Sequence, residues 1–119
     1  MKQVISVGTT LGSYSPAILA TGSKQVFVSG QIAVDLESDI RTQTRQAIKK
    51  IEAVLESVSF YLSDIVKTTL YLTDISLFDT VNREYALFFP SEPPARVTVQ
   101  VAALPKNALI MIDAIAVRD

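Results

Sequence analysis

Three side chains near the end of the chain have the types and the spacing that could bind a small anion and move a proton. Arg96 and Thr98 fall on one face of an extended run, because alternate residues of a strand share a face. Asp113 is the only ionisable residue within the apolar run 108–117. A guanidinium offers a planar fork of donors to a carboxylate, and a carboxylate in apolar surroundings must find partners or change its protonation state. These three residues are therefore the first candidates for a functional site.

The spacing of these residues predicts a closing hairpin. A short turn centred on Pro105 and Lys106 separates the run that holds Arg96 from the run that holds Asp113. Antiparallel pairing about that turn would place Asp113 opposite Thr98, and directly opposed residues point to the same face of a sheet. Arg96, Thr98 and Asp113 are then expected to converge. A buried ion pair between Arg96 and Asp113 that serves only the fold is an equally good interpretation of the residues alone.

Earlier stretches of the chain have the periodicity of the strands that must position these residues. Strands are expected at residues 2–7, 18–20, 25–34 and 65–73, and the turn residues 21–24 that close the second of them suggest a hairpin. Gly30 interrupts the third of these strands. Glycine inside a strand often marks a bulge or a place where another group approaches the backbone closely.

A long amphipathic helix is expected after the third strand. Ser38 or Asp39 can cap it, and apolar residues recur at three- and four-residue spacing from Ile40 to Val58. Acidic and basic residues are mixed on the opposite side, which is typical of a solvated surface. The helix is therefore expected to cover a sheet with one face only.

A second helix is expected after the strand at residues 65–73. Ser76 followed by Asp79 resembles a capping box that opens it, and Pro90 ends it. Its apolar stripe has helical spacing and is interpreted as core. The stripe consists of Leu77, Phe78, Val81, Tyr85, Phe88 and Phe89.

The order of these elements predicts a fold of the α/β (α+β) class. The order is βββαβαββ, and it indicates a mixed sheet with both helices on one face. The last strand is apolar on both sides, which is typical of a strand that is covered on both faces. We therefore expect the face without helices to be buried against other copies of the chain, with a pocket at the subunit junction.

Length and charge restrict the classes of function. A chain of 119 residues suits a single domain, residues 1–119, and its hydrophobic fraction of 49% exceeds what that size needs. The 11 basic and 12 acidic residues form no basic cluster, so nucleic acid is not an expected partner. Since no run of about 18 apolar residues and no signal-like N-terminus is present, we expect a cytoplasmic protein that neither spans a membrane nor is secreted.

Two missing residue types exclude several kinds of chemistry. The count of 0 Cys removes thiol nucleophiles, disulfides and thiolate metal sites. The count of 0 His removes the usual general base and the commonest metal ligand. Serine triads and zinc-dependent hydrolysis are therefore not expected.

Six segments, taken in order, resemble the RidA (YjgF) family of reactive-intermediate deaminases. Each segment alone is a weak signal, but their order along nearly the whole chain makes the resemblance strong. The segments are 11–17 (LGSYSPA), 28–32 (VSGQI), 64–69 (DIVKTT), 80–82 (TVN) with Tyr85 and Phe88–Phe89, 94–96 (PAR), and 104–106 (LPK) before 112–117 (IDAIAV).

This resemblance implies a fold, an assembly and an activity. The fold is a compact protomer of the chorismate-mutase-like kind, and the assembly is a homotrimer with its clefts between subunits. The activity is hydrolysis of enamines and imines such as 2-aminoacrylate, which pyridoxal-phosphate-dependent dehydratases release, to a 2-keto acid and ammonia. The resemblance implies no cofactor.

The resemblance also implies roles for seven residues. Arg96 matches the arginine that holds the substrate carboxylate. Asp113 matches an acidic position, usually Glu, that helps to position or activate water, and Thr98 stands where many members have Cys. Because Asp is one methylene shorter than Glu, the reach of this group is reduced, and a misplacement near 1 Å can cost about 100-fold in rate. The remaining cleft positions are Tyr14, Ser29, the Gly30 backbone and Asn82.

The departure at Asp113 keeps a second function open. On that hypothesis the chain is a non-catalytic trimer that binds small carboxylates, such as 2-keto acids, and regulates a partner enzyme. RNA cleavage has been attached to some relatives, but the acidic balance of charge and the absence of His argue against it as a main role.

Overall fold

The computed structural model describes residues 1–119, and its elements follow the predicted order βββαβαββ. Three short 3-10 turns, η1 to η3, lie between the main elements. Neither of the two helices has the length and the apolar character needed to cross a membrane. In chain order the elements are β1 (Lys2–Ile5), β2 (Ala17–Ala20), β3 (Lys24–Gln31), α1 (Ile40–Glu56), η1 (Leu62–Asp64), β4 (Ile65–Leu72), η2 (Ile75–Leu77), α2 (Phe78–Ala86), β5 (Ala95–Gln100), η3 (Pro105–Asn107) and β6 (Ile110–Arg118).

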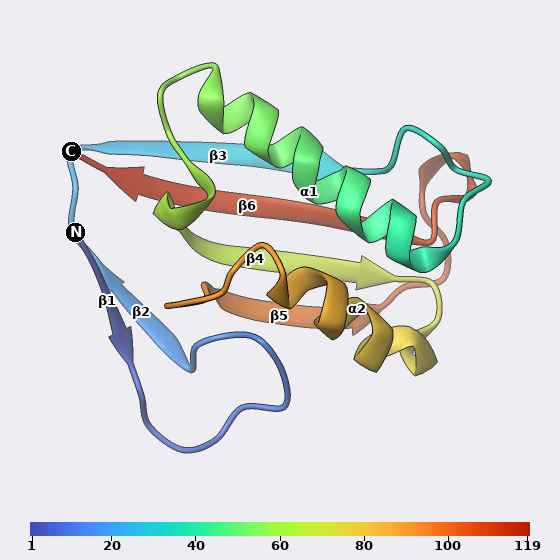
Figure 1. Ribbon diagram of the computed structural model, residues 1–119, viewed down its shortest axis with the longest axis horizontal. Coiled ribbons are helices and arrows are strands. Elements are labelled where there is room, and N and C mark those ends of the chain that lie inside the picture. The colour runs from blue at the N-terminus through green and yellow to red at the C-terminus, as the bar shows by residue number, and fades with distance from the viewer.

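The main sheet is mixed and has the strand order β3-β6-β4-β5. β6 pairs antiparallel with β3 and with β4, whereas β4 and β5 are parallel. β1 and β2 form a separate antiparallel hairpin. The turn at residues 21–24 leads from this hairpin into β3, which pairs with β6 and not with β2. Both helices lie over the same face of the main sheet, α1 across β3 and β6 and α2 across β4 and β5 (Figure 1). The predicted fold class is therefore confirmed.

The prediction of a closing hairpin is wrong. β5 and β6 are consecutive in the sequence, but β4 lies between them. α2 carries the chain from β4 back to a parallel neighbour, β5, as a crossover helix does. β6 then takes the inner place between β3 and β4, which suits a strand with apolar residues on both sides. Asp113 consequently pairs with Thr69, and not with Thr98.

One hydrophobic core fills the space between the helices and the sheet. Alternate residues of the inner strands point into it, among them Leu70, Leu72 and Ile112, each at most 1% exposed. α1 contributes its predicted apolar face, but Val54 and Val58 lie outside the core. The other side of the sheet has no helix over it, and we call it the open face. It carries Phe27, Thr69, Tyr71, Val97, Val99, Met111, Asp113 and Ile115.

The two helices begin differently from one another. Asp39 caps α1, because its carboxylate accepts a hydrogen bond of 3.0 Å from the Thr42 N–H. The capping box predicted at Ser76 is wrong. Asp74 accepts from the Ser76 N–H at 3.0 Å and caps η2, and α2 starts only after this short turn. The Asp74 carboxylate, which stands two residues before the position at which Ser76 was predicted to cap the helix, accepts the hydrogen bond of a free backbone N–H.

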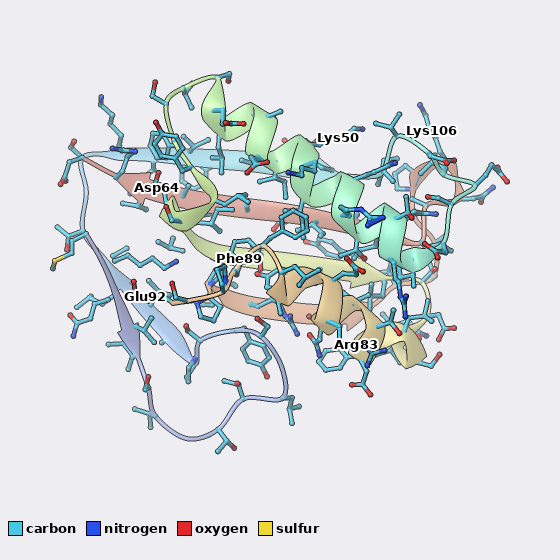
Figure 2. All side chains as sticks on the ribbon, viewed as in Figure 1. Lys50, Asp64, Arg83, Phe89, Glu92 and Lys106 are labelled. Atoms are coloured by element: carbon cyan, nitrogen blue, oxygen red, sulfur yellow. The ribbon has the colours of Figure 1, made fainter.

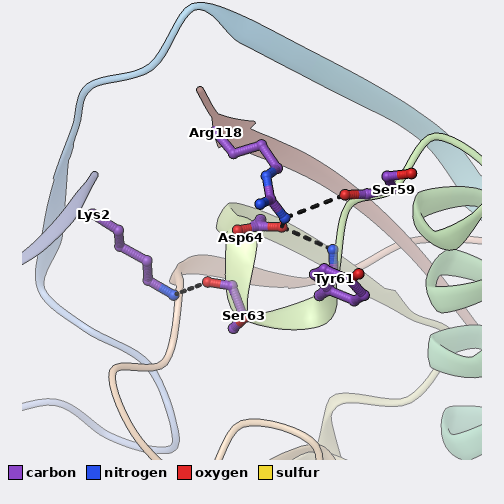
Figure 3. A network of polar contacts seen from close by, with 6 residues as sticks. All are labelled: Lys2, Ser59, Tyr61, Ser63, Asp64 and Arg118. Carbon is purple, nitrogen blue, oxygen red and sulfur yellow. Dashed lines mark hydrogen bonds and ion pairs between the residues drawn. The ribbon is translucent and has the colours of Figure 1, made fainter.

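Polar contacts fasten the first hairpin to the end of the main sheet (Figure 3). The Lys2 ammonium donates to the carbonyls of Ser63 (3.4 Å) and Ile65 (2.9 Å), and burial lowers the pKa of this lysine. Arg118 at the end of β6 pairs with Asp64 at 3.3 Å and donates to the Ser59 carbonyl. β1, η1 and β6 are thereby held together.

One buried polar side chain was not anticipated from the sequence. Gln43 is fully buried on α1. Its amide nitrogen donates to the carbonyls of Leu36 (3.2 Å) and Ser38 (2.9 Å), and its oxygen accepts from the Leu109 N–H at 3.0 Å. This side chain ties the segment before α1 to the start of β6.

Replacement of Gln43 by methionine is expected to lower the free energy of unfolding by about 1–3 kcal/mol, because it leaves buried backbone groups without partners. The matched control is Gln46→Met on the same helix, since Gln46 is partly exposed and accepts only from the Asp35 N–H. Its effect should stay within about 0.5 kcal/mol. Urea unfolding followed by circular dichroism measures both, and equal losses would contradict the role given to Gln43.

Candidate functional site

Arg96 lies at the centre of a cage of aromatic rings. It stands on β5, on the face that the helices cover, and pairs in register with Thr68 of β4. Its guanidinium carbon lies 4.8 Å from the ring centroid of Tyr14, 5.0 Å from that of Tyr85 and 5.5 Å from that of Phe78. The negative faces of these rings attract the cation.

The positive charge of Arg96 has no carboxylate partner in the chain. The ion pairs of this structure join Lys49 to Glu52 and Arg118 to Asp64. Burial lowers the pKa of Arg96, and the nearby hydroxyls of Tyr85 and Tyr14 oppose that effect in part. An arginine nevertheless stays protonated in proteins. The site therefore presents a desolvated cation that an incoming anion could neutralise.

The guanidinium keeps a complete pair of donors for such an anion. Its Nη2 donates to the Asn82 side-chain oxygen at 2.6 Å, while Nε and Nη1 are buried and have no partner. Asn82 occupies one of the five N–H groups of the guanidinium, and Nη2 carries two of these groups. The second N–H of Nη2 therefore remains parallel either to that of Nε, at the side of the guanidinium, or to one of Nη1, at its end. Two parallel donors match the two oxygens of a carboxylate.

α2 supplies one wall of the cage through helical spacing. Phe78, Asn82 and Tyr85 stand four and then three positions apart, so they share a face of the helix. The Tyr85 hydroxyl forms a buried hydrogen bond of 2.8 Å with the Thr68 hydroxyl. Phe78 and Tyr85 were interpreted from the sequence as core only. Their spacing from Asn82 was the signal that could have placed them at the site.

The segment between β1 and β2 supplies the opposite wall. Ser15 forms a parallel bridge with Ala95, its N–H donates to the Pro94 carbonyl at 3.1 Å, and its hydroxyl donates to the Pro93 carbonyl. Ser15, which follows Tyr14, is therefore held against Ala95, which precedes Arg96. The Tyr14 hydroxyl accepts from the Leu11 N–H at 3.1 Å, which folds this segment over the guanidinium.

Gly12 allows this segment to approach α2 closely. A Cβ at this position would lie 2.7 Å from the side-chain nitrogen of Asn82, well inside contact distance. Asn82, in turn, accepts from Arg96. The absence of a side chain at Gly12 therefore lets the segment pack against the residue that orients the guanidinium.

A small pocket of about 130 Å³ opens beside Arg96. Leu11 and Phe78 form its apolar walls, and the Thr98 hydroxyl is buried there without a hydrogen-bond partner. No group of three or more His, Cys, Asp or Glu side chains is arranged to hold a metal ion. The remaining lining residues are Tyr14 and Arg96.

Asp113 is not part of this cluster, and the predictions of convergence and of an Arg96–Asp113 ion pair are wrong. Arg96 aligns with Thr68 and Asp113 aligns with Thr69, and successive residues of β4 point to opposite faces. On the open face, the Asp113 carboxylate accepts from the Thr69 N–H at 3.1 Å and from the Tyr71 hydroxyl at 3.2 Å. Burial, together with the charge and hydrogen bond of Asp113, raises the pKa of Tyr71.

Ser29 and Gly30 lie with Asp113 and not with Arg96. The register of β3 against β6 shifts between Val28 and Gln31, so the predicted bulge at Gly30 is confirmed. A Cβ on Gly30 would lie 2.6 Å from the Met111 sulfur, which shows how closely the bulge approaches β6. The seven predicted residues thus form two groups. Tyr14, Asn82, Arg96 and Thr98 lie together on the side of the sheet that the helices cover, whereas Ser29 and Gly30 stand on β3 opposite Asp113, which lies on the open face.

Comparisons with known proteins agree on one family. A family model described as Endoribonuclease L-PSP matches residues 6–118. A RutC family protein of Pyrococcus horikoshii is 41% identical, with 100% of both chains covered. The human 2-iminobutanoate/2-iminopropanoate deaminase is 36% identical over 99% of this chain and 91% of its own. The crystal structure of E. coli TdcF with bound serine is 34% identical, with a TM-score of 0.77 over 98% of this chain and 99% of that one.

Among the 4 tyrosines, Tyr85 is expected to ionise last. Burial favours its neutral phenol and raises its pKa from 10.0 to about 12. Because the pKa is raised in the folded chain, the stability that it contributes is complete below pH 10 and is lost as the pH rises towards 12. Titration of tyrosinate absorbance on the wild type and on Tyr85→Phe measures this step. The variant should lack the highest step, and loss of a lower step instead would refute the assignment.

Proposed function

Because this chain belongs to the Endoribonuclease L-PSP family, which includes the RidA and YjgF proteins, we propose that it hydrolyses small 2-imino acids and their enamine tautomers to 2-keto acids and ammonia. Several relatives are named as deaminases of this type, including the rat, human and chloroplast proteins. The observation that carries the proposal is Arg96, a partly buried cation with two buried, unpaired donor nitrogens beside a small pocket.

The proposed reaction begins with capture of the substrate carboxylate by Arg96. An enamine such as 2-aminoacrylate takes a proton on its terminal carbon to become the imine. Water then adds to the imine carbon, a proton moves to the nitrogen, and loss of ammonia leaves the 2-keto acid. Arg96 fixes the carboxylate, and a fixed orientation lowers the entropic cost of the addition step. Asp113 would position or activate the water, as the family resemblance implies.

The size and lining of the pocket favour short substrates. Its volume of about 130 Å³ is far below the 300–1,000 Å³ of pockets for drug-sized ligands. Leu11 and Phe78 offer apolar surface to a short aliphatic side chain. E. coli TdcF, which shares 34% of its residues with this chain, binds serine, a small molecule that also carries a carboxylate.

The open face supports a further part of the proposal, a homotrimer. Phe27 is 68% exposed on this face, and Val97 and Val99 are 42% and 39% exposed. Exposed apolar side chains on a sheet face without helices favour association, and cyclic symmetry would cover them with copies of the same chain. A cleft between copies could then join the Arg96 cluster of one copy to Asp113, Ser29 and Gly30 of another. The cytoplasmic location expected from the sequence stays a prediction.

RNA cleavage is not part of the proposal, although the family description names an endoribonuclease. The chain has no His to act as a general base and carries a net charge of −1. Arg96, the cation on which the proposal rests, is enclosed by rings beside a small pocket whose size suits a small acid.

Substitution of Arg96 by alanine is expected to reduce kcat/KM for freshly generated 2-aminoacrylate by roughly 10- to 150-fold, the equivalent of a charge-assisted hydrogen bond worth about 1.5–3 kcal/mol. Ammonia and pyruvate release are measured. The matched control is Arg83→Ala, because Arg83 projects from α2 and donates only to Thr80 (Figure 2). Its activity should equal that of the wild type.

Two outcomes of this experiment would overturn the deaminase proposal. Equal rates in folded wild type and Arg96→Ala would remove Arg96 from the reaction. Binding of pyruvate to Arg96 without turnover of 2-aminoacrylate by the wild type would favour the alternative of a non-catalytic carboxylate binder.

Substitution of Phe27 by glutamate is expected to dissociate the proposed trimer, because it places a charge on the apolar open face. Light scattering after size-exclusion chromatography measures the mass in solution. Leu87→Glu is the matched control, since Leu87 is 73% exposed and follows α2 on the helix side of the molecule. A wild type that is monomeric at every concentration, or a trimer that survives Phe27→Glu, would count against this interface.

A further inference from the structure

Three buried polar side-chain atoms in the chain have no hydrogen-bond partner, and they belong to two neighbouring residues of one strand face. They are Nε and Nη1 of Arg96 and the Thr98 hydroxyl oxygen. A buried polar atom without a partner costs roughly 1–3 kcal/mol. Such atoms are few in native proteins, and each requires an explanation. Their concentration at one pocket indicates a ligand whose carboxylate pairs with one edge of the guanidinium, through Nε or through Nη1, and whose second polar group pairs with the Thr98 hydroxyl.

Thr98 is placed to contact the part of a ligand next to its carboxylate. Arg96 and Thr98 are separated by one residue on β5, so their side chains rise from the same face about 6.6 Å apart along the strand. In a 2-imino or 2-keto acid, the polar group at position 2 is bonded to the carbon adjacent to the carboxylate. A carboxylate held by Arg96 therefore brings that group into the small pocket that Thr98 also lines.

We propose that the Thr98 hydroxyl recognises the polar group at position 2 of the bound acid and so selects 2-imino and 2-keto acids over unsubstituted carboxylates. This inference rests on the proposed function, because it assumes that Arg96 holds the carboxylate. A hydroxyl both donates and accepts. It can accept from the N–H of the imine substrate and donate to the carbonyl oxygen of the keto-acid product, so one side chain serves both ends of the reaction.

The residue type at this position supports the role. A threonine is branched at Cβ and holds few rotamers, so its hydroxyl is oriented before the ligand arrives. A thiol is a weaker donor and acceptor than a hydroxyl. The Thr98 hydroxyl is already buried without a partner. An acid without a group at position 2 leaves it unpaired, whereas a substituted acid supplies the missing hydrogen bond and gains its free energy.

The test compares pyruvate with propanoate, which have the same carboxylate and number of carbons. Calorimetry measures both dissociation constants for the wild type, Thr98→Val, Thr98→Ser and Thr98→Cys. The wild type is expected to prefer pyruvate by roughly 10-fold, the effect of about one neutral hydrogen bond. Thr98→Val, which keeps the shape, should bind both acids equally, with propanoate affinity unchanged. Thr98→Ser should restore the preference, and Thr98→Cys should restore it in part.

The outcomes separate this inference from the proposed function. If Thr98→Val keeps the wild-type preference while Arg96→Ala weakens both acids, the carboxylate site stands and the role of Thr98 is refuted. If Arg96→Ala leaves both affinities unchanged, or neither acid binds the wild type, the proposed function and this inference both fail. Should Thr98→Val not fold, Thr98→Ser is compared with Thr98→Cys. Equal preferences for pyruvate over propanoate in these two variants would contradict recognition by the hydroxyl.

Discussion

A partly buried arginine without a counter-charge is the constraint on which the rest of this structure depends. A desolvated cation is costly unless it is paired. Around Arg96, the faces of three aromatic rings and one amide oxygen offset only part of that cost. These contacts stabilise the cation in the folded chain, but they leave Nε and Nη1 without partners, so these donors remain for a ligand. A carboxylate in the place of Asn82 would stabilise the fold better, but it would occupy the charge that an anionic substrate needs.

The cage around this cation is assembled from segments that are far apart in the sequence. α2 connects β4 to β5, so the helix that carries Phe78 and Tyr85 must pack over the strand that carries Arg96. Tyr14 arrives by a different route, on the segment between β1 and β2, which the Ser15 contacts fasten to the start of β5. The hairpin that holds this segment is anchored at its other end by Lys2. The geometry of the site therefore depends in part on the Lys2 contacts at the end of the main sheet.

Sequence patterns predicted which residues share a face, but not which strands are neighbours. Alternation correctly grouped Arg96 with Thr98, and helical spacing located α1 and its apolar side. The pairing of β5 with β6 was wrong, because periodicity within a strand contains no information about the strand beside it, and the short connection favoured a hairpin. The same limit hid Phe78 and Tyr85, since a ring that packs on a guanidinium and a ring in a core have the same spacing. Gln43 was missed for a related reason, because its partners are backbone groups.

The separation of Arg96 from Asp113 follows from strand alternation and cannot be undone within one copy of the chain. Arg96 and Asp113 align with consecutive residues of β4, and a shift of register that joined them would turn every side chain of a strand to the wrong face. If Asp113 acts beside the Arg96 fork, it must therefore come from another copy. If the proposed trimer forms, the association that covers Phe27 and Val97 also supplies that carboxylate. Substrate binding and water activation would then belong to different chains, and activity would fall with dilution as the copies separate.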